Sequence, residues 1–250
     1  MGRYEHEIMS AIGLRGTVSV RDLAALLDVS EQTVRRVVKP MVDRGEVRKI
    51  HGAIVGVTAT GDAPFLERMN VERDAKVGIA ATVADMVRDG DTIALDTGST
   101  TAFIAQALRG HHGLTVVTNS SFVATTLATV PGNRVHMAGV ELRNHDGASF
   151  DAQAFRVVNA MRVRVAVLSA SAVDPSRGVM VHEQCEAEMS ASMGEIADLR
   201  IVAADASKFG RSALVALPSL RADDVVVTDR RPDRTIERTL RPARVIVAPS

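Results

Sequence analysis

Two short amphipathic helices are predicted near the N-terminus. Ser19 and Asp22 have the spacing of a capping box, and the apolar positions that follow are Leu23, Ala24, Leu26 and Leu27. A two-residue turn comes next, and Ser30 stands where its hydroxyl can cap a second helix. The apolar face of that helix consists of Val34, Val37, Val38, Met41 and Val42. This spacing predicts a helix-turn-helix.

The opposite face of the second helix is polar and basic. Positions 35 to 49 hold six Arg or Lys residues against two acidic residues, whereas the whole chain has a formal net charge of zero. An exposed helix of this kind suits the DNA major groove, where Arg binds guanine edges and Gln binds adenine edges. The residues predicted to contact DNA from this helix are Ser30, Gln32, Thr33, Arg35, Arg36 and Lys39.

A hairpin is predicted directly after this helix. Residues 46–50 have the pattern of a strand, His51 and Gly52 make a turn, and residues 53–57 return. Helix, turn, helix and hairpin in this order are typical of a winged helix-turn-helix, whose wing can contact phosphates through Arg48, Lys49 and His51. The alternative is a small helical hairpin whose charges are merely solvated.

The rest of the chain alternates short apolar runs with helical patterns. Residues 57–64 lose periodicity and collect Thr, Gly, Asp and Pro, which is typical of a linker. We therefore expect a DNA-binding domain at residues 1–57, a linker at 58–73 and an α/β domain at 74–250. The runs favour a doubly wound, mostly parallel sheet with helices on both faces. They are residues 93–96, 114–119, 134–139, 163–170, 199–206, 224–229 and 244–248.

A glycine turn follows the first of these strands. Gly98 permits the turn, and the amides and hydroxyls of Ser99, Thr100 and Thr101 converge at a helix N-terminus, where a phosphate is favoured. The alternative is an ordinary helix cap.

Other polar residues are predicted at the same edge of the sheet. Asp96, Asn119 and Lys208 follow the carboxyl ends of strands, where parallel sheets bind ligands. For Lys208 the alternative is a solvated loop lysine. Together with the glycine turn, these residues predict an anion-binding pocket.

Composition restricts the class of protein. The chain of 250 residues is 46% hydrophobic and 3% aromatic, which fits globular domains with an aliphatic core. Its single cysteine, Cys185, is expected to be inert and indicates a reducing cytosol. The N-terminus lacks the apolar segment of a leader peptide, and no run reaches the length of a membrane span. A soluble cytoplasmic protein without cofactor or metal is expected.

The run VSVRDLAALLDVSEQTVRRVVKPMVDRGEVRKIHGAI resembles the DNA-binding module of the DeoR family of sugar-metabolism repressors. That family shows V-S-x-x-T-[VI]-R-R-D-L followed by an R-x-H-G-G-A wing. Here Val37 stands in place of Asp, the wing has one Gly fewer, and Pro40 lies within the recognition helix. Because proline removes a backbone donor, a kinked or shortened helix is expected.

Residues 64–230 resemble the DeoR effector domain through PFLERMNVERDAK, GDTIALDTGSTT, LTVVTNS, MAGVELR, DASKFGR and VVVTD. That domain is similar in fold to sugar-phosphate isomerases, deaminases and CoA transferases. The resemblance implies a DNA-binding repressor of a carbohydrate operon that acts on double-stranded DNA as a homodimer or larger homo-oligomer. It also implies a phosphorylated sugar as effector, bound by Asp96, Gly98, Ser99, Thr100, Thr101, Asn119, Gly139 and Lys208.

The alternative function is a sugar-phosphate isomerase or deaminase with an accessory module. Such an enzyme needs a base beside the ligand, for which Asp96, Glu186 and Glu188 are available. An enzyme function does not explain the basic recognition helix. A purely structural role explains neither the helix-turn-helix nor the anion-binding turn. The acidic start of the helix near Glu183 is interpreted as a solvated face, with ligand contact as the alternative.

Overall fold

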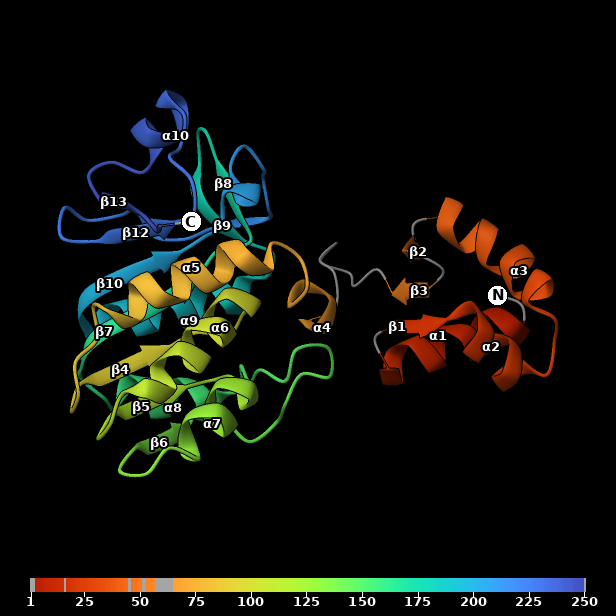
Figure 1. Ribbon diagram of the computed structural model, residues 1–250, viewed down its shortest axis with the longest axis horizontal. Helices are drawn as coiled ribbons and strands as arrows, with labels where there is room; N and C mark the ends of the chain where they lie inside the picture. The colour runs from red at the N-terminus through yellow and green to blue at the C-terminus, as the bar shows by residue number, and fades with distance from the viewer. Residues whose placement is uncertain (1–2, 16, 45, 51–52, 57–64, 250) are drawn as a thin grey trace. The chain divides into compact units, whose positions relative to one another are not determined.

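The protein is described by a computed structural model at residues 3–15, 17–44, 46–50, 53–56 and 65–249 (Figure 1). The chain divides into two compact units, Met1–Asn70 and Val71–Ser250. Each unit has its own cluster of buried apolar side chains, so each is described by itself.

The N-terminal unit is a winged helix-turn-helix, as the sequence predicts. Its elements are α1 (Arg3–Arg15), β1 (Thr17–Ser19), α2 (Val20–Leu27), α3 (Glu31–Asp43), β2 (Val47–Ile50) and β3 (Ala53–Gly56), followed by the short helix α4 (Phe65–Arg68). The three strands form an antiparallel sheet in the order β1-β3-β2. Ile8, Leu23, Met41 and Ile54 are fully buried between the helices and this sheet. The helix α1 and strand β1 were not predicted.

Local hydrogen bonds begin both helices of the motif. The Ser19 hydroxyl accepts from the Asp22 amide at 2.9 Å, and the Ser30 hydroxyl accepts from the Thr33 amide at 3.2 Å. Both predicted caps are therefore confirmed. Pro40 does not shorten α3, because the helix continues to Asp43 and ends at Arg44.

The larger unit is built on a seven-stranded sheet in the order β13-β12-β10-β7-β4-β5-β6, and every neighbouring pair is parallel. All seven predicted runs form strands. They are β4 (Thr92–Leu95), β5 (Thr115–Thr118), β6 (Arg134–Met137), β7 (Val163–Ser169), β10 (Ala197–Ala203), β12 (Val225–Thr228) and β13 (Arg244–Val247).

The helices cover the sheet in two layers (Figure 1). One layer contains α5 (Arg73–Ala84), α6 (Ser99–Ala107) and α7 (Ser121–Ala128), and the other contains α8 (Ala152–Asn159) and α9 (Gln184–Glu195). Further short elements are η1 (Leu108–Gly110), η2 (Ala206–Lys208) and α10 (Arg234–Thr239). This arrangement confirms the predicted doubly wound α/β class.

The strand order reverses between β4 and β7. From β4 the chain moves outward through β5 to β6, and it then returns to place β7 on the other side of β4. In open parallel sheets such a reversal point opens a crevice at the carboxyl ends of the two central strands. The turn that begins at Asp96 follows β4 directly and therefore lies at this reversal point.

Two features of the chain were not predicted. A small antiparallel sheet with the order β11-β9-β8 is formed by β8 (Ala172–Asp174), β9 (Gly178–Val181) and β11 (Val215–Ala216). The segment expected to be a linker, residues 58–73, includes α4, while residues 57–64 lie outside the described part of the chain.

Candidate DNA-binding surface and effector site

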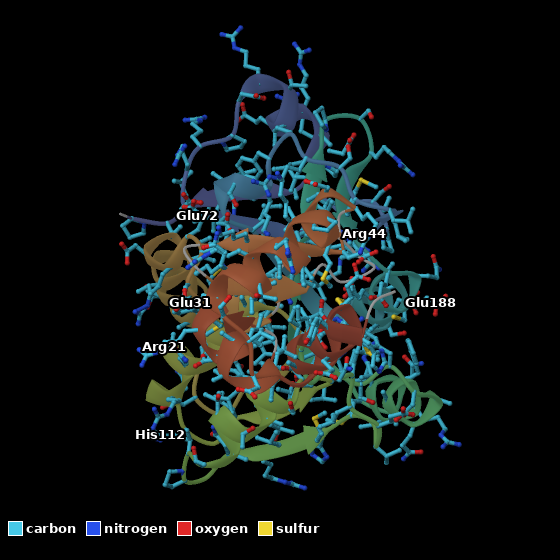
Figure 2. The ribbon with its side chains drawn as sticks, turned by 90° about the vertical axis from the view of Figure 1, so that its right-hand side faces the viewer. Arg21, Glu31, Arg44, Glu72, His112 and Glu188 are labelled. Carbon is cyan, nitrogen blue, oxygen red and sulfur yellow. The ribbon has the colours of Figure 1, made fainter. Side chains whose placement is uncertain are left out.

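The basic face of α3 is exposed. Gln32, Arg35, Arg36 and Lys39 are all solvent-accessible. Glu31, which is labelled in Figure 2, begins the helix and forms an ion pair with Arg35 at 2.6 Å. Within the described part of the chain, the side chains of Gln32, Arg36 and Lys39 make no hydrogen bond or ion pair. These three are therefore free to bind a ligand, and Arg35 is held beside a carboxylate.

A groove with a volume of about 300 Å³ lies between α3 and the wing. It is lined by Arg35, Val38, Lys39, Val42, Asp43, Lys49 and Ile54. Three cations and one carboxylate give the groove a positive charge, which suits a phosphate backbone. Gln32 and Arg36, which are four residues apart, do not line this groove.

The other predicted DNA contacts have different surroundings. The hydroxyls of Ser30 and Thr33 lie 2.9 Å apart, and Ser30 also caps the helix, so both groups already have partners. Arg48 lies in β2, and His51 lies outside the described residues. Arg44 binds Glu46 at 2.7 Å and Glu5 at 2.8 Å, which explains why this arginine does not add to the free basic face.

Asp96 is the centre of the polar groups in the larger unit. Only 3% of its surface is exposed, and its carboxylate accepts from the Thr97 amide at 2.7 Å, the Ser190 hydroxyl at 3.0 Å and the Ser169 amide at 3.5 Å. Ser169 ends β7 and Ser190 lies on α9. The carboxylate therefore joins both central strands and the helix that covers them.

Burial determines the protonation of this group. Loss of solvent raises the pKa of Asp96 to about 7, and the negative charge of Glu186 also raises it, against the hydrogen bonds from Thr97 and Ser190. Asp96 is thus an acid that exchanges its proton near neutral pH.

The helix that follows, α6, begins without a side-chain cap. Gly98 has a φ of +147°, and a Cβ at this position would lie 3.0 Å from the Cβ of Ser169. The first amides of any helix lack intrahelical acceptors, and among the described residues no preceding side chain accepts from them. The turn therefore presents unused donors and the positive end of a helix dipole.

The hydroxyls of this turn differ in their availability. Thr101 is fully buried and donates to the Gly98 carbonyl at 2.9 Å, so its hydroxyl belongs to the helix. Those of Ser99 and Thr100 make no hydrogen bond with the described residues. Thr97 has a buried hydroxyl oxygen that finds no partner among the residues that the structure describes. Three of these hydroxyls are thus available to a bound molecule.

Asn119 and Gly139 organise the neighbouring edge of the sheet. The side-chain NH2 of Asn119 donates to the Ser149 carbonyl at 3.2 Å, whereas its buried side-chain oxygen has no partner within the described part of the chain. A Cβ on Gly139 would lie 1.9 Å from the Ser149 hydroxyl, so close packing explains this glycine without a ligand. Asn119 can still accept a hydrogen bond from a ligand.

Lys208 follows β10 in the short helix η2. Its side chain is partly exposed and forms no ion pair or hydrogen bond with the part of the chain that is described. The adjacent turn is fixed by Asp205, whose carboxylate accepts from the Ser207 amide at 3.1 Å. Lys208 remains a free cation on a rigid turn.

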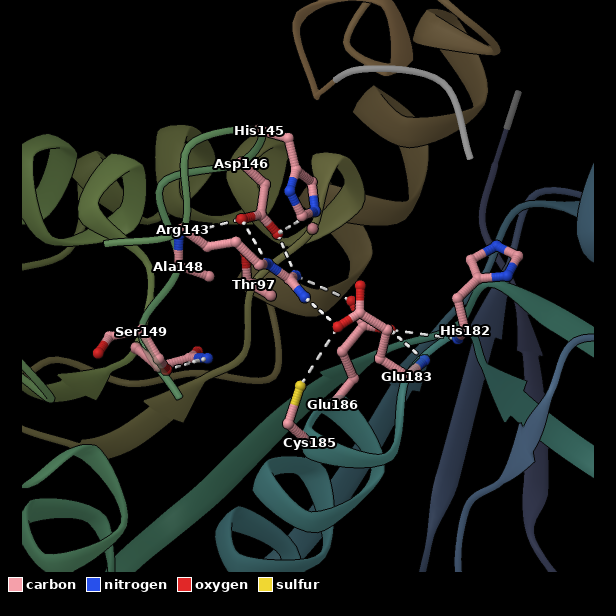
Figure 3. A network of polar contacts seen from close by, with 12 residues as sticks. Thr97, Arg143, His145, Asp146, Ala148, Ser149, His182, Glu183, Cys185 and Glu186 are labelled. Atoms are coloured by element: carbon pink, nitrogen blue, oxygen red, sulfur yellow. Dashed lines mark hydrogen bonds and ion pairs between the residues drawn. The ribbon is translucent and has the colours of Figure 1, made fainter. Parts of the chain in front are cut away.

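A guanidinium that sequence reasoning did not single out lies at the same edge (Figure 3). Arg143 contacts Asp146, Glu183 and Glu186. Glu183 and Glu186 are therefore half-buried partners of an arginine, and the expected solvated face is wrong for these two; Glu188 alone is exposed. The signal in the sequence is the arginine that ends the MAGVELR segment.

Among solved structures, ribose 5-phosphate isomerase A from Methanocaldococcus jannaschii is similar to this chain, with a TM-score of 0.41, 16% sequence identity and 55% of each chain covered. An initiation factor eIF-2B from Pyrococcus horikoshii gives a TM-score of 0.41 at 23% identity, over 58% of this chain and 50% of that one. These scores are too low to support any functional assignment. Among the described residues, no helix has the length and apolar character needed to cross a membrane.

Sequence relatives cover nearly the whole chain. The glycerol-3-phosphate regulon repressor of Escherichia coli is 28% identical over 93% of this chain and 92% of its own length. The transcriptional repressor CsqR of the same species is 30% identical over 96% and 92%, and the repressor AccR of Agrobacterium fabrum is 29% identical over 89% and 87%. Since these relatives are transcriptional repressors, the isomerase or deaminase alternative is not supported.

Two family profiles match the two units. The DeoR-like helix-turn-helix domain matches residues 5–60, and the DeoR C terminal sensor domain matches residues 71–230. The second match alone covers more than half of the chain. The chain is a DNA-binding transcriptional regulator that belongs to the DeoR family.

Proposed function

We propose that the sensor unit binds a monophosphorylated sugar at the glycine turn after β4, and that this binding changes the affinity of the winged helix-turn-helix for its operator. The observation that carries the proposal is the N-terminus of α6, which has no side-chain cap among the described residues and lies at the strand reversal. The name of one relative, the glycerol-3-phosphate regulon repressor, supports a phosphorylated polyol as the class of molecule involved.

Each group at the site has a proposed role. The phosphate takes the amides and hydroxyls of Ser99 and Thr100, and Lys208 supplies a positive charge. The sugar hydroxyls face two acceptors. One is the Asn119 side-chain oxygen, which has no donor among the described residues, and the other is the Asp96 carboxylate, whose pKa burial raises to about 7. Amides alone do not distinguish phosphate from sulfate, so the acceptors would select a sugar.

The two sides of α3 make different contacts with DNA. Gln32 and Arg36 do not line the groove and contact base edges, while Arg35, Lys39 and Lys49 line it and hold a phosphate backbone. Repression requires a stable complex at a paired site, so we also propose a symmetric homodimer or larger homo-oligomer, to be measured by sedimentation equilibrium. A cytosolic location is part of the same proposal.

Calorimetry with a panel of triose, pentose and hexose monophosphates, each paired with its free sugar, tests the ligand. The expected result is that at least one monophosphate binds in the micromolar range and its free sugar binds much more weakly, because the helix N-terminus recognises the anion. Equal binding of both members of each pair, or no binding by any compound, would contradict the proposal. Selection of bound sequences from a random DNA library tests the second part of the proposal, sequence-specific binding of an operator.

A further inference from the structure

The segment between β6 and α8 is fastened to the carboxyl edge of the sheet. The Ser149 amide donates to the Asn119 carbonyl at 2.8 Å, and the Ser121 amide donates to the Gly147 carbonyl at 3.0 Å. Residues 143–149 therefore form a rigid loop on the β5 side of the strand reversal, and this loop carries Arg143.

The Arg143 guanidinium joins this loop to the start of α9 (Figure 3). Its Nε donates to Asp146 at 3.0 Å within the loop, and its Nη2 donates to Glu186 at 2.9 Å on the helix. Nη1 lies 3.1 Å from Glu183, and the guanidinium carbon lies 4.5 Å from the centre of the Phe150 ring. The planar guanidinium contacts the carboxylates in a fixed geometry and also stacks on the Phe150 ring. The ammonium group of a lysine cannot reproduce this arrangement.

Glu186 passes this restraint to the helix. Its second carboxylate oxygen accepts from the amides of His182 and Glu183, both at 3.2 Å, so it fixes the first turn of α9. One turn later on the same face, the Ser190 hydroxyl donates to Asp96 at 3.0 Å. A continuous chain of contacts therefore connects Asp146, Arg143, Glu186, α9, Ser190 and Asp96.

Arg143 is disfavoured as a ligand for the effector phosphate, even though its Nη1 makes no hydrogen bond with the described residues. Three carboxylates surround one guanidinium, and the hydrogen bonds to Asp146 and Glu186 raise the pKa of Arg143 against the effect of burial. An incoming anion would have to displace these carboxylates from a half-buried position, which costs more than binding at the free amides of α6. The role of this arginine is therefore indirect.

We propose that Arg143 is a positioning residue of the effector site: it ties the loop at residues 143–149 to α9, and so holds Ser190 on Asp96 beside the glycine turn before the effector binds. This inference rests on the proposed function, because it names the residue that preorganises the same pocket. Preorganisation lowers the conformational cost of binding, so its loss weakens affinity without removing a ligand contact.

The test compares Arg143→Gln, Ser190→Ala and the double variant in the full-length protein. The probe is the sugar monophosphate that binds the wild type most tightly in the panel. Each single change is expected to weaken its binding by about 10-fold, and the double variant to be within about 2-fold of the weaker single variant, because both act through one path. Arg143→Lys should match Arg143→Gln, since the planar guanidinium is lost in both.

Two further variants keep the test decisive. Arg162→Gln makes the same chemical change at an exposed ion pair with Asp198 at the amino end of β7, and it should leave effector affinity unchanged. Glu186→Gln should weaken binding without adding to Arg143→Gln, and it serves if the arginine variant does not fold. DNA affinity without effector should stay within about 2-fold of the wild type in every variant.

Unchanged effector affinity in Arg143→Gln, or losses that multiply in the double variant, would overturn the inference. The two levels of failure are distinguishable. If Gly98→Ala abolishes binding while Arg143→Gln does not affect it, only the positioning role is wrong. If no panel member binds the wild type, or Gly98→Ala has no effect, the proposed effector site itself is wrong.

Discussion

Two helix N-termini, those of α3 and α6, are built in opposite ways. The Ser30 hydroxyl caps α3 by accepting from the Thr33 amide, and the exposed side chains of this helix, such as Arg36, are available to a partner. Gly98 leaves α6 uncapped, and its first residues are buried at a strand reversal. DNA is therefore bound by exposed side chains of a helix whose N-terminus is capped. A small anion such as phosphate instead needs main-chain donors in a buried turn.

The substitution Gly98→Ala separates the two sites most strongly. The added Cβ would lie 3.0 Å from the Cβ of Ser169 at a φ that disfavours any side chain, so the amides of α6 must move. We expect effector affinity to fall by about 100-fold, since strain of this kind costs about 1–3 kcal/mol. Calorimetry gives the affinity, and fluorescence anisotropy should show unchanged DNA binding.

Gly110→Ala is the matched control, because its Cβ would meet no atom within 4 Å. If Gly98→Ala bound the effector as well as this control does, the turn would not be the site.

On the other helix, Arg36→Ala should weaken binding to the selected DNA by about 10-fold to 100-fold, which corresponds to a base contact of about 1–3 kcal/mol. Lys39 lines the groove, so Lys39→Ala should instead weaken binding to all DNA sequences alike. The salt dependence of DNA binding should fall by the equivalent of about one phosphate contact. Anisotropy titrations at several salt concentrations distinguish the two. Equal losses on specific and random DNA for Arg36→Ala would refute the division of α3 into two sides.

The pH dependence of stability sharpens the comparison on the sensor side. Burial raises the pKa of Asp96 from 3.8 to about 7, so between these values the folded state holds a proton that the unfolded state has lost. The stability contributed by this group is present below its unfolded pKa and is lost as the pH rises through about 7.

Asp96→Asn removes the loss of stability at high pH that the Asp96 carboxyl causes. We expect the variant to gain roughly 1 kcal/mol or more in unfolding free energy relative to the wild type on going from pH 5 to pH 8, since one pKa unit corresponds to about 1.4 kcal/mol. Urea unfolding at the two pH values measures the difference. A gain of the same size at both would show that the Asp96 proton is not linked to folding.

The smallest effect is expected from the cap of α3. Ser30→Ala removes the acceptor of the Thr33 amide and should lower the stability of the DNA-binding unit by about 1 kcal/mol, with Ser30→Asp as the restoring variant. Thermal unfolding followed by circular dichroism reports the change. Effector affinity should not respond, because it depends on α6 and not on α3.

Features with a local cause were predictable from the sequence. The caps at Ser19 and Ser30 involve residues three apart, and the buried strands consist of consecutive apolar residues such as those of β7. The glycine turn also carries its own signal, because Gly98 precedes three hydroxyl residues. Short-range periodicity and turn chemistry specify these elements.

Features that depend on distant partners were not predictable. Strand β1 has three residues and exists because Thr17 pairs with Val55, and β11 exists because Val215 pairs with Val181. Glu186 was interpreted as solvated because its partner, Arg143, lies 43 residues earlier in the chain. The hydroxyl of Thr101 was placed in the pocket, although it bonds its own helix turn at Gly98.

The central claim is that occupancy of the sensor unit changes DNA binding by the other unit. The most direct measurement is the DNA dissociation constant of the full-length protein with and without a saturating amount of the sugar monophosphate that it binds, on DNA selected from the random library. We expect a change of about 5-fold to 150-fold in the wild type, in line with typical coupling free energies, and a much smaller change in Gly98→Ala at an effector concentration that just saturates the wild type. Identical dissociation constants in the wild type with and without effector would contradict the account.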